Sequence, residues 1–544
     1  MPIRQQPTAS RRATSLRTQR ADAAAVSAAA SSRISSPDVV RQKKATPDFI
    51  PHPDWLGTAL CVLGLFITGL LDHEKTPTQI ARFAAIGTAL SLLASIACDA
   101  RRGGLRNLVR ADLLALISLY YLTLCEFLFP QPMFDTMVVA PSVTRGVIAC
   151  FVGFAGLVIG RHLISGKRQP FESLFTAPVS TTLIFSVFAI SFFGGFAYML
   201  ACCNFNPVLM VRWFMEPRFS QPWSRGALGD WRAMLHELEM LLFLVPPLGG
   251  VVLARRKRFS TPAILFVCFG VFFTLFYGFC SGTRYFLAAY LITLVAGFAF
   301  AASARQKKEI IVASVVAAVV MLISTVLMLE FRHMGLRAFF AHDYEEWETP
   351  GEAQDDRPTL YVDLNLYPIC RIVETFPRVH DYLGFEMPFL AIVRPVPRAL
   401  WPGKPEGVSF PIEDVVGADG WTVAATFVGE AYMSGGNLAV FLIALALGAL
   451  ARWWGLLASP RNSEFGVLIY ASGFFAAAMA MRSMLVLTTA LLPSVVGIIG
   501  GFIFIRRIKS IKARRAEKGA LHRGSRGIGA QSAKGARAVI FTRP

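Results

Sequence analysis

The sequence predicts an all-α polytopic integral membrane protein with about 12 transmembrane helices and both termini in the cytoplasm. The first reason is composition, since 54% of the 544 residues are hydrophobic and only 16% are charged. Ordinary soluble proteins have fewer apolar residues and nearly a quarter charged ones, so this composition argues against a soluble globular protein. The other two reasons are a series of long apolar runs and an uneven distribution of basic residues among the loops.

The apolar runs have the length of membrane spans. A helix needs about 20 mostly apolar residues to cross the hydrocarbon core, and it pairs its backbone polar groups within one segment. Runs of this kind lie at 55–71, 83–98, 111–129, 146–160, 179–201, 235–253, 261–279, 284–303, 310–329, 436–450, 465–481 and 484–505. The largest loop therefore lies between the ninth and tenth predicted helices.

Basic residues gather in alternate loops, as expected if those loops stay in the cytoplasm. The loops concerned are 99–110, 161–178, 254–260, 304–309 and 451–464. Twelve helices with both termini inside place all five on the cytoplasmic side. One helix more or fewer would move several of them outside.

The net charge of +19 is concentrated in the two tails. Residues 1–50 carry nine Lys or Arg and three acids, and residues 506–544 carry twelve Lys or Arg and one acid. We interpret both as disordered basic cytoplasmic tails rather than as a transit peptide or a nucleic-acid-binding surface. Between them, the sequence predicts helices one to nine at 51–329, a large external loop at 330–423 and helices ten to twelve at 424–505.

The loop 330–423 has the features of a folded segment. It is net acidic, with 16 acids against 8 Lys or Arg, and loops of this length are often functional. A helical spacing of apolar residues predicts a short amphipathic helix on the membrane surface, with the residues Ile369, Ile372, Val373 and Phe376 on one face. The stretch 388–405 contains five prolines, which exclude a long helix, and we expect it to be interfacial or re-entrant.

Glycine and tryptophan positions agree with a bundle of spans. The pairs Gly156–Gly160 and Gly497–Gly501 have the spacing that lets two membrane helices pack closely. Tryptophans lie near predicted helix ends, where amphipathic rings favour the membrane interface: Trp55, Trp213, Trp231, Trp421, Trp453 and Trp454.

Several ionisable residues lie at the predicted outer ends of helices, where a charge is costly and usually functional. Arg284 begins the eighth helix, Arg482 separates the eleventh from the twelfth, and Glu430 precedes the tenth. Others on this side are Arg232, His236 and Glu239, which share one helix face, and Arg332 and His333, which follow the ninth helix. Arginine suits a phosphate because its planar guanidinium donates two parallel hydrogen bonds, although an arginine at a helix end can also simply reach lipid headgroups.

The sequence predicts no metal and no cofactor. Residues 342–348 contain Asp, Glu and His, but their spacing matches no known metal motif, and we interpret them as a solvated acidic turn. Walker, HExxH, GxSxG and dinucleotide motifs are absent from the sequence. The nine cysteines contain no CxxC pair and are too few for a disulfide framework in a chain of this length.

Four short motifs resemble those of a known family. Residues 393–405 read VRPVPRALWPGKP, residues 429–436 read GEAYMSGG, residues 282–284 read GTR, and residues 223–226 read WSRG. In this order, within residues 200–505, they resemble motifs of bacterial oligosaccharide repeat-unit (O-antigen, Wzy-like) polymerases. The large external loop in the second half of the chain is also similar to that family. Some of those polymerases carry an Arg followed eleven residues later by a Gly in this loop, and residues 330–423 contain no such pair.

The resemblance implies a glycosyltransferase that is similar in plan to GT-C-type enzymes and O-antigen ligases. It implies polymerisation of undecaprenyl-pyrophosphate-linked repeat units into a surface polysaccharide such as O-antigen, capsule or exopolysaccharide. The reaction would take place at the periplasmic face of the bacterial inner membrane, without a metal. Besides the lipid-linked oligosaccharide and the bilayer, the implied partners are a chain-length regulator and a flippase, and no nucleic acid is expected.

Such a transfer needs cations for the leaving pyrophosphate and a base for the acceptor hydroxyl. We expect Arg284, Arg394 and Arg398 to carry most of the pyrophosphate binding. The full predicted substrate-binding set is Arg225, Arg232, His236, Glu239, Arg284, Arg332, Arg371, Arg394, Arg398, Lys404 and Arg482. The candidates for the base are His333, His380 and Glu430. Each of two candidates also has an explanation without a catalytic role: His380 could be a surface-loop histidine, and Glu430 could be the structural partner of an arginine.

Two other functions fit part of the sequence. Twelve helices with both ends inside is also a common plan of secondary transporters, but the halves show no internal repeat and the link after the sixth helix is short. An O-antigen ligase, which moves finished polymer to another acceptor, shares the general plan. The proline-rich motif at 393–405 favours the polymerase over the ligase.

Overall fold

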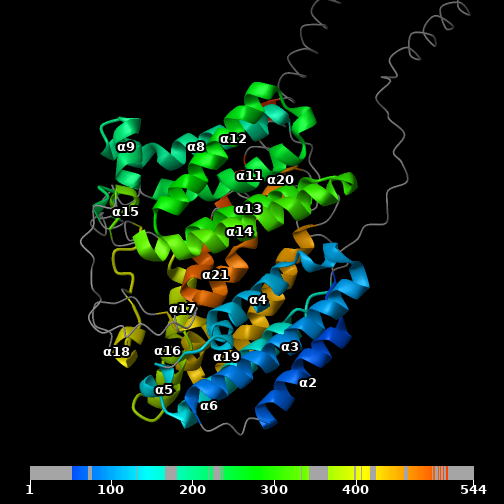
Figure 1. Cartoon of the computed structure of the whole chain (residues 1–544), viewed down its shortest axis with the longest axis vertical. Helices are drawn as coiled ribbons and strands as arrows, with labels where there is room; N and C mark the ends of the chain where they lie inside the picture. The colour runs from blue at the N-terminus through cyan, green and yellow to red at the C-terminus, as the bar shows by residue number, and fades with distance from the viewer. Residues whose placement is uncertain are drawn as a thin grey trace, which may run out of the picture. The chain divides into compact units, whose positions relative to one another are not determined.

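A computed structural model describes residues 52–71, 76–131, 133–165, 180–217, 220–223, 237–331, 334–341, 365–396, 400–405, 407–416, 424–458, 464–492 and 494–496, with 235, 500, 503, 507, 510 and 511 as single positions. Within these ranges the chain forms α-helices and short 3-10 helices joined by turns, and these residues include no β-strand (Figure 1). The prediction of an all-α protein is confirmed.

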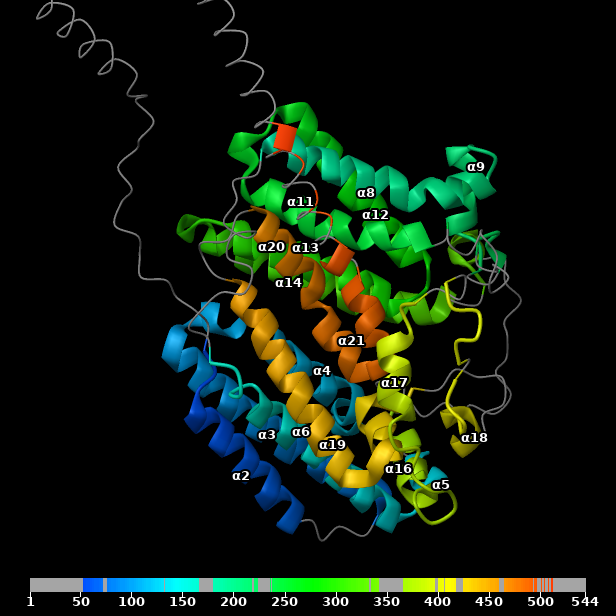
Figure 2. The same ribbon diagram turned by 180° about the vertical axis from the view of Figure 1, so that it is seen from behind.

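A first group of helices packs around one large apolar core and combines early with late parts of the chain. Its members are α2 (Trp55–Leu71), α3 (Pro77–Gly103), η1 (Leu105–Leu108), α4 (Ala111–Thr123), η2 (Cys125–Leu128), α5 (Phe134–Met137), α6 (Ala140–Gly160), α16 (Leu366–Thr375), α17 (Glu386–Val393), α18 (Ile412–Val416) and α19 (Thr426–Gly455). Figures 1 and 2 show α19 lying along α6 and beside α4, with α16 and α17 at its N-terminal end. The late helix α19 is therefore an integral part of the N-terminal bundle.

A second group surrounds a separate core that is rich in phenylalanine. Its members are α8 (Thr181–Cys202), α9 (Pro207–Phe214), η4 (Glu237–Leu244), α11 (Val245–Ala254), η5 (Arg256–Arg258), α12 (Thr261–Cys280), α13 (Arg284–Ala301), η6 (Ala304–Gln306), α14 (Lys307–Phe331) and α15 (Leu336–Ala341). Ring pairs such as Phe192–Phe266 and Phe196–Phe273 are edge-to-face, the arrangement that aromatic quadrupoles favour.

The last helices join the two groups. α20 (Glu464–Phe474) packs against α13 of the second group, whereas α21 (Ala476–Arg482) packs against α4 of the first (Figure 2). After η7 (Leu456–Ala458), these helices lead to a further apolar helix at Met484–Val496. α21 therefore lies where the first group, the second group and the last helix of the chain come together.

Six helices are long and apolar enough to cross a membrane: α3, α6, α8, α12, α13 and α19. Each of the twelve sequence runs also coincides with helix in the described residues, although several of these helices are short or interrupted. Large apolar side chains on α12 and α14 are exposed, among them Phe272 and Leu322, as expected for surfaces that face lipid. The count of twelve crossings and the sides of the two termini stay predictions.

The close approach of α6 and α19 explains one glycine pair. A Cβ on Gly160 would lie 2.2 Å from the carbonyl oxygen of Leu445, and one on Gly156 would lie 2.6 Å from Ala444 Cβ. From the other side, a Cβ on Gly448 would lie 2.4 Å from the carbonyl oxygen of Leu157. The predicted tight packing at Gly156–Gly160 is confirmed, while Gly497 and Gly501 lie outside the described residues.

The two predictions for short segments of the large loop turn out differently. α16 is the predicted short helix, but Ile369, Ile372 and Val373 are buried against α6 and α19 and do not face the membrane surface. α17 is a short helix that contains Pro388 and ends before Pro395, and it packs against α19, while the interfacial or re-entrant placement of 388–405 stays a prediction. Trp454 also differs from its prediction, since it is buried and donates a hydrogen bond to the carbonyl oxygen of Tyr470 at 3.2 Å.

α19 is interrupted near its start. Gly435 and Gly436 leave the helical conformation, and Gly436 has a positive φ of 64°. A Cβ at Gly436 would also lie 2.7 Å from the hydroxyl of Tyr382, so this position requires glycine on both counts. Non-helical backbone at membrane depth is tolerated only where protein or a cavity surrounds it, and it often marks a binding site.

Candidate functional site

Glu430 lies in the part of α19 that precedes this break, and it is only 3% exposed. Its carboxylate accepts a hydrogen bond from the hydroxyl of Ser483 on one oxygen and from the backbone N–H of Met484 at 2.6 Å on the other. Ser483 is the extended residue between α21 and the next helix, and its Oγ accepts a hydrogen bond from the N–H of Leu485 at 3.2 Å. Glu430 and Ser483 together cap the helix that starts at Met484 and hold two interrupted helices in contact.

Arg394 comes directly after α17 and approaches the same carboxylate. Its side chain is exposed, and its positive charge interacts electrostatically with Glu430. Lys404, from the proline-rich segment, donates hydrogen bonds to the carbonyl oxygens of Arg394 at 2.6 Å and of Val396 at 3.0 Å. Lys404 thus fixes the turn that carries Arg394.

Arg482, the last residue of α21, connects this region with α13. Its guanidinium lies over the ring of Tyr285, 5.5 Å from the centroid, in a cation–π contact. Tyr285 is the second residue of α13 and Arg284 is the first, so both arginines are brought to one end of this helix pair. The turn before α13 is stabilised locally, because Ser281 Oγ accepts a hydrogen bond from the N–H of Thr283 at 3.2 Å.

A second carboxylate, that of Glu239, interacts with Tyr277 and Tyr290. Glu239, on η4, accepts a hydrogen bond from the phenolic hydroxyl of Tyr277 on α12 at 2.7 Å. Tyr285 and Tyr290 of α13 both interact electrostatically with Tyr277, and Tyr290 also interacts with Glu239. The Tyr290 ring is 0% exposed, and its hydroxyl has no hydrogen-bond partner among the described residues.

Pairwise contacts and neighbouring positions in the chain link these side chains, which we call together the polar belt. Its members are Glu239, Tyr277, Arg284, Tyr285, Tyr290, Arg394, Glu430, Arg482 and Ser483. They come from the two helix groups and from α21, which joins them. Three arginines stand against two carboxylates, so the belt carries a positive charge in excess and is chemically suited to an anionic group such as a phosphate.

Three other predicted residues are not members of the belt. Arg371 forms an ion pair with Glu374 at 2.7 Å on α16, and Ser142 of α6 donates a hydrogen bond to the same carboxylate. The ring of His380 stacks on Phe410, with the ring centroids 4.5 Å apart. Lys404 binds carbonyl oxygens, as described above, so the described contacts of these residues are structural.

Several predicted positions lie outside the described residues. They are Arg225, Arg232, His236, Arg332, His333, Arg398 and the acidic stretch 342–348. In the part of the chain that the structure describes, no group of three His, Cys, Asp or Glu side chains is arranged to hold a metal ion.

A buried ionic cluster lies at the opposite end of α19. Asp99 accepts hydrogen bonds from Arg110 at 2.7 Å and from Arg161 at 3.1 Å, and Arg110 also pairs with Asp112 at 2.9 Å. These four side chains are at most 4% exposed. The nearby Arg452 of α19, which is 2% exposed, contacts His52 Nδ1 at 2.9 Å. The sequence predicts that Arg110, Arg161 and Arg452 lie in exposed cytoplasmic loops. Their side chains instead point inward and connect α3, α4, α6 and α19.

His162 closes this cluster towards α2. Its ring stacks on Trp55 with centroids 3.7 Å apart, and its Nε2 lies 2.7 Å from Thr58 Oγ1. Burial, assisted by the positive charge of Arg161, lowers the pKa of His162 to about 4. The histidine is therefore neutral near pH 7.

Sequence reasoning missed four members of the belt: Ser483, Tyr277, Tyr285 and Tyr290. For Ser483, the only indication in the sequence was that the eleventh and twelfth apolar runs follow each other without a loop, which predicts a break in the helix between them. Tyr285 adjoins the predicted Arg284. Tyr277 and Tyr290 lie within long apolar runs, and only the packing of α12, α13 and η4 brings them to Glu239.

Comparisons with known proteins give one match. Residues 365–507 match a family described as a domain of unknown function (DUF8712), a segment that contains α16, α17, Glu430 and Arg482. No curated protein matches the chain, and no solved structure matches it.

Proposed function

We propose that this chain polymerises lipid-pyrophosphate-linked oligosaccharide repeat units, by metal-independent glycosyl transfer, at the periplasmic face of a bacterial inner membrane. The observation that carries the proposal is the polar belt, in which Arg394 interacts with Glu430, Arg482 contacts Tyr285, and Arg284 begins the helix that carries Tyr285. The motif resemblance at 282–284, 393–405 and 429–436 concerns segments of this same region.

The chemistry of such a transfer fits the belt. Negative charge grows on the pyrophosphate as its bond to the sugar breaks, and fixed cations in a site of low dielectric stabilise that charge without a metal. Arg482 is held in position by Tyr285, and Arg394 by the turn that Lys404 fixes. Side chains held in this way need little reorganisation when the substrate reacts.

The two ends of α19 support the proposed orientation. Glu430 and Arg452 are 22 residues apart, which corresponds to at most about 33 Å along a helix and to less with the break. This length is close to the roughly 30 Å thickness of a hydrocarbon core. The ionic cluster contains the ends of the helices that the basic loops assign to the cytoplasm, so the belt at the other end of α19 is expected to face the periplasm.

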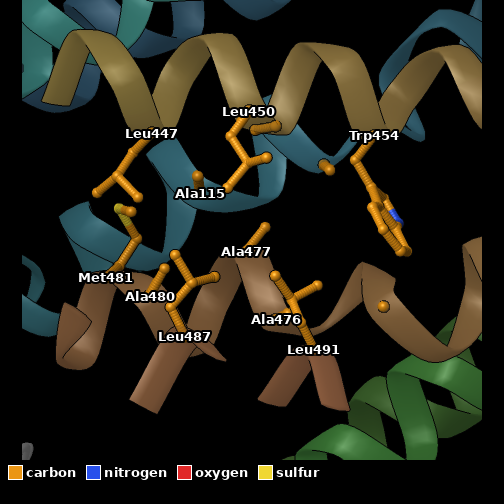
Figure 3. Close-up of a pocket in the computed structure, with 13 residues that line it drawn as sticks. Ala115, Leu447, Leu450, Trp454, Ala476, Ala477, Ala480, Met481, Leu487 and Leu491 are labelled. Atoms are coloured by element: carbon orange, nitrogen blue, oxygen red, sulfur yellow. The ribbon is translucent and has the colours of Figure 1, made fainter. Parts of the chain in front are cut away.

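An apolar pocket lies between α4, the C-terminal half of α19 and α21 (Figure 3), and it extends from Met481 to Ala451 and Trp454 at the ionic-cluster end of α19. It is lined by Ala, Leu and Met side chains of α4, α19 and α21, and Met481 in its wall precedes Arg482.

The proposal is tested by deleting the gene and complementing it with variants. Loss of the chain should leave single lipid-linked repeat units and remove long polymer, as seen on a polysaccharide gel. Arg394→Ala and Arg482→Ala should each lower polymerisation by about 100- to 1,000-fold, the cost of removing one charge-stabilising donor. Arg378→Ala is the matched control, since this exposed arginine lies outside the belt and should leave polymer length unchanged.

The same experiment separates the other two functions. Unchanged polymer with loss of uptake or export of a small solute would establish a transporter instead. Normal polymer that is not attached to its final acceptor would establish a ligase. Full activity of both arginine variants at normal protein levels would refute the role of the belt.

A further inference from the structure

The helix α4 begins inside the protein, beside the buried ionic cluster. Arg110 occupies its N-cap position and makes no side-chain capping hydrogen bond, and Ala111 and Leu113 of the first turn are at most 2% exposed. The first N–H groups of a helix have no partner within the helix, and the helix dipole makes this end positive. The start of α4 therefore presents buried donors to its surroundings.

The guanidinium of Arg110 has one edge bound and one nitrogen left over. Its Nε and Nη2 donate hydrogen bonds to the two carboxylate oxygens of Asp112 at 3.0 and 2.9 Å, and Nη2 also donates to Asp99 at 2.7 Å. Nη1 is buried and has no hydrogen-bond partner among the described residues. A buried donor of a charged group is costly to leave without a partner, so this nitrogen indicates a bound group that completes it.

Tyr470 of α20 brings a second group of this kind to the same place. Its side chain is buried, and its hydroxyl has no hydrogen-bond partner of suitable geometry in the described part of the chain. The hydroxyl lies beside the N–H of Ala111 and interacts electrostatically with Arg110 and Asp112. Two buried polar groups, from α4 and from α20, therefore converge on the first turn of α4.

Unfilled space reaches this turn. The apolar pocket of Figure 3 includes Ala111 in its lining, together with Trp454, whose Nε1 donates a hydrogen bond to the carbonyl oxygen of Tyr470 at 3.2 Å. The groups around the turn are donors, and the carboxylates of Asp99 and Asp112 already accept hydrogen bonds from arginine. A water molecule would bring two further protons that need acceptors, whereas an anion only accepts.

We propose that the first turn of α4 binds a small monovalent anion of the chloride type, through Arg110 Nη1, the Tyr470 hydroxyl and the first N–H groups of the helix. The helix dipole and the fixed guanidinium charge both favour an anion there, and the positive charge of Arg452 also acts at Tyr470. A small ion suits this place better than a phosphate, because the lining of the pocket is apolar and supplies no further donors. The bound anion stabilises the contact between α4 and α20.

The test measures thermal unfolding of the purified full-length protein in lipid nanodiscs, with sodium chloride or sodium gluconate at the same ionic strength. Chloride should raise the melting temperature along a saturable curve, by about 2–4 °C, because a ligand that binds only the folded state stabilises it. Gluconate is too large for an enclosed site and should give no such rise. The site lies at the opposite end of α19 from the polar belt, so this measurement does not depend on transferase activity.

Two variants locate the effect. Tyr470→Phe should raise the dissociation constant for chloride by about 10- to 100-fold, because a hydrogen bond to a charged group is lost. Tyr120→Phe is the matched control: its hydroxyl is also buried without a partner among the described residues, but it lies nine residues after Ala111 on the same helix. This variant should keep the wild-type response to chloride.

Two results would overturn the proposal. One is an equal melting temperature of the wild type in chloride and in gluconate at every concentration, which would assign the place to water. The other is an unchanged chloride dissociation constant in Tyr470→Phe, which would place the chloride effect elsewhere. Crystals grown in bromide give an independent check, since an anomalous-scattering peak should lie in contact with Arg110 Nη1 and Tyr470 Oη.

Discussion

Replacing Asp99 by asparagine should strongly destabilise the N-terminal bundle. The side chain of Asp99 is completely buried and joins three segments: it accepts hydrogen bonds from Arg110, Arg161 and the N–H of Asp54. An amide keeps one acceptor oxygen, but it loses the charge and presents an NH2 group to two guanidinium groups. Two charge-assisted hydrogen bonds at about 1.5–3 kcal/mol each are affected, and two arginines lose a buried counter-charge. We therefore expect a loss of about 3–5 kcal/mol.

The assay is unfolding of the full-length protein in mixed micelles with increasing SDS, followed by tryptophan fluorescence. Asp54→Asn is the matched control, because the Asp54–Arg102 pair is 3.9 Å long and partly exposed. Exposed pairs contribute about 1 kcal/mol or less, so this variant should unfold almost as the wild type does. Equal midpoints for the two variants would refute the view that the ionic cluster holds the bundle together.

Two further predictions concern the same bundle. Gly160→Ala should sharply reduce the yield of folded protein, because its Cβ would lie 2.2 Å from the carbonyl oxygen of Leu445. Gly455→Ala is the control, since no atom lies within 4 Å of the new Cβ, and its yield should be normal. Gel filtration of both proteins in detergent measures the folded yield, and equal yields would contradict the close helix contact. The stability should also fall as the pH falls from about 6.5 to about 4, because burial lowers the pKa of His162 to about 4 and the unfolded chain binds a proton there first. Melting temperatures over this pH range should fall less steeply in His162→Gln, and an identical slope would exclude His162 as a source of the dependence.

Much of the fold was predictable because membrane helices are encoded by local composition. The run at 55–71 is α2 with identical bounds, and the run at 261–279 is α12 within one residue. Short elements were predictable where local chemistry is strong, as in α16, whose apolar residues have helical spacing. The spacing of Gly156 and Gly160 predicted close packing correctly, but it did not identify α19 as the partner.

The candidate site was only partly predictable. Arg284, Glu430 and Arg482 were chosen because a charge at a helix end is costly, and Arg394 as an arginine of the outer face; the structure links Arg394 to Glu430 and Arg482 to Tyr285. Arg371 was chosen as a pyrophosphate ligand and His380 as a candidate base, but their described contacts lie elsewhere, because a sequence shows the residue type and not its neighbour. Tyr277 and Tyr290 were missed since a tyrosine in an apolar run is read as part of the core.

By itself, the sequence determined that the chain is helical, that it is apolar enough for a membrane, and on which side its basic loops are expected. These properties follow from the length and composition of single segments, which do not depend on distant residues. Only the tertiary structure decided that Arg110 and Arg161 turn inward to Asp99, and that Glu430 meets Ser483 across 53 positions of the chain. Such contacts depend on which helices pack together, and that choice is made by side-chain shape and charge pairing between segments far apart in the sequence.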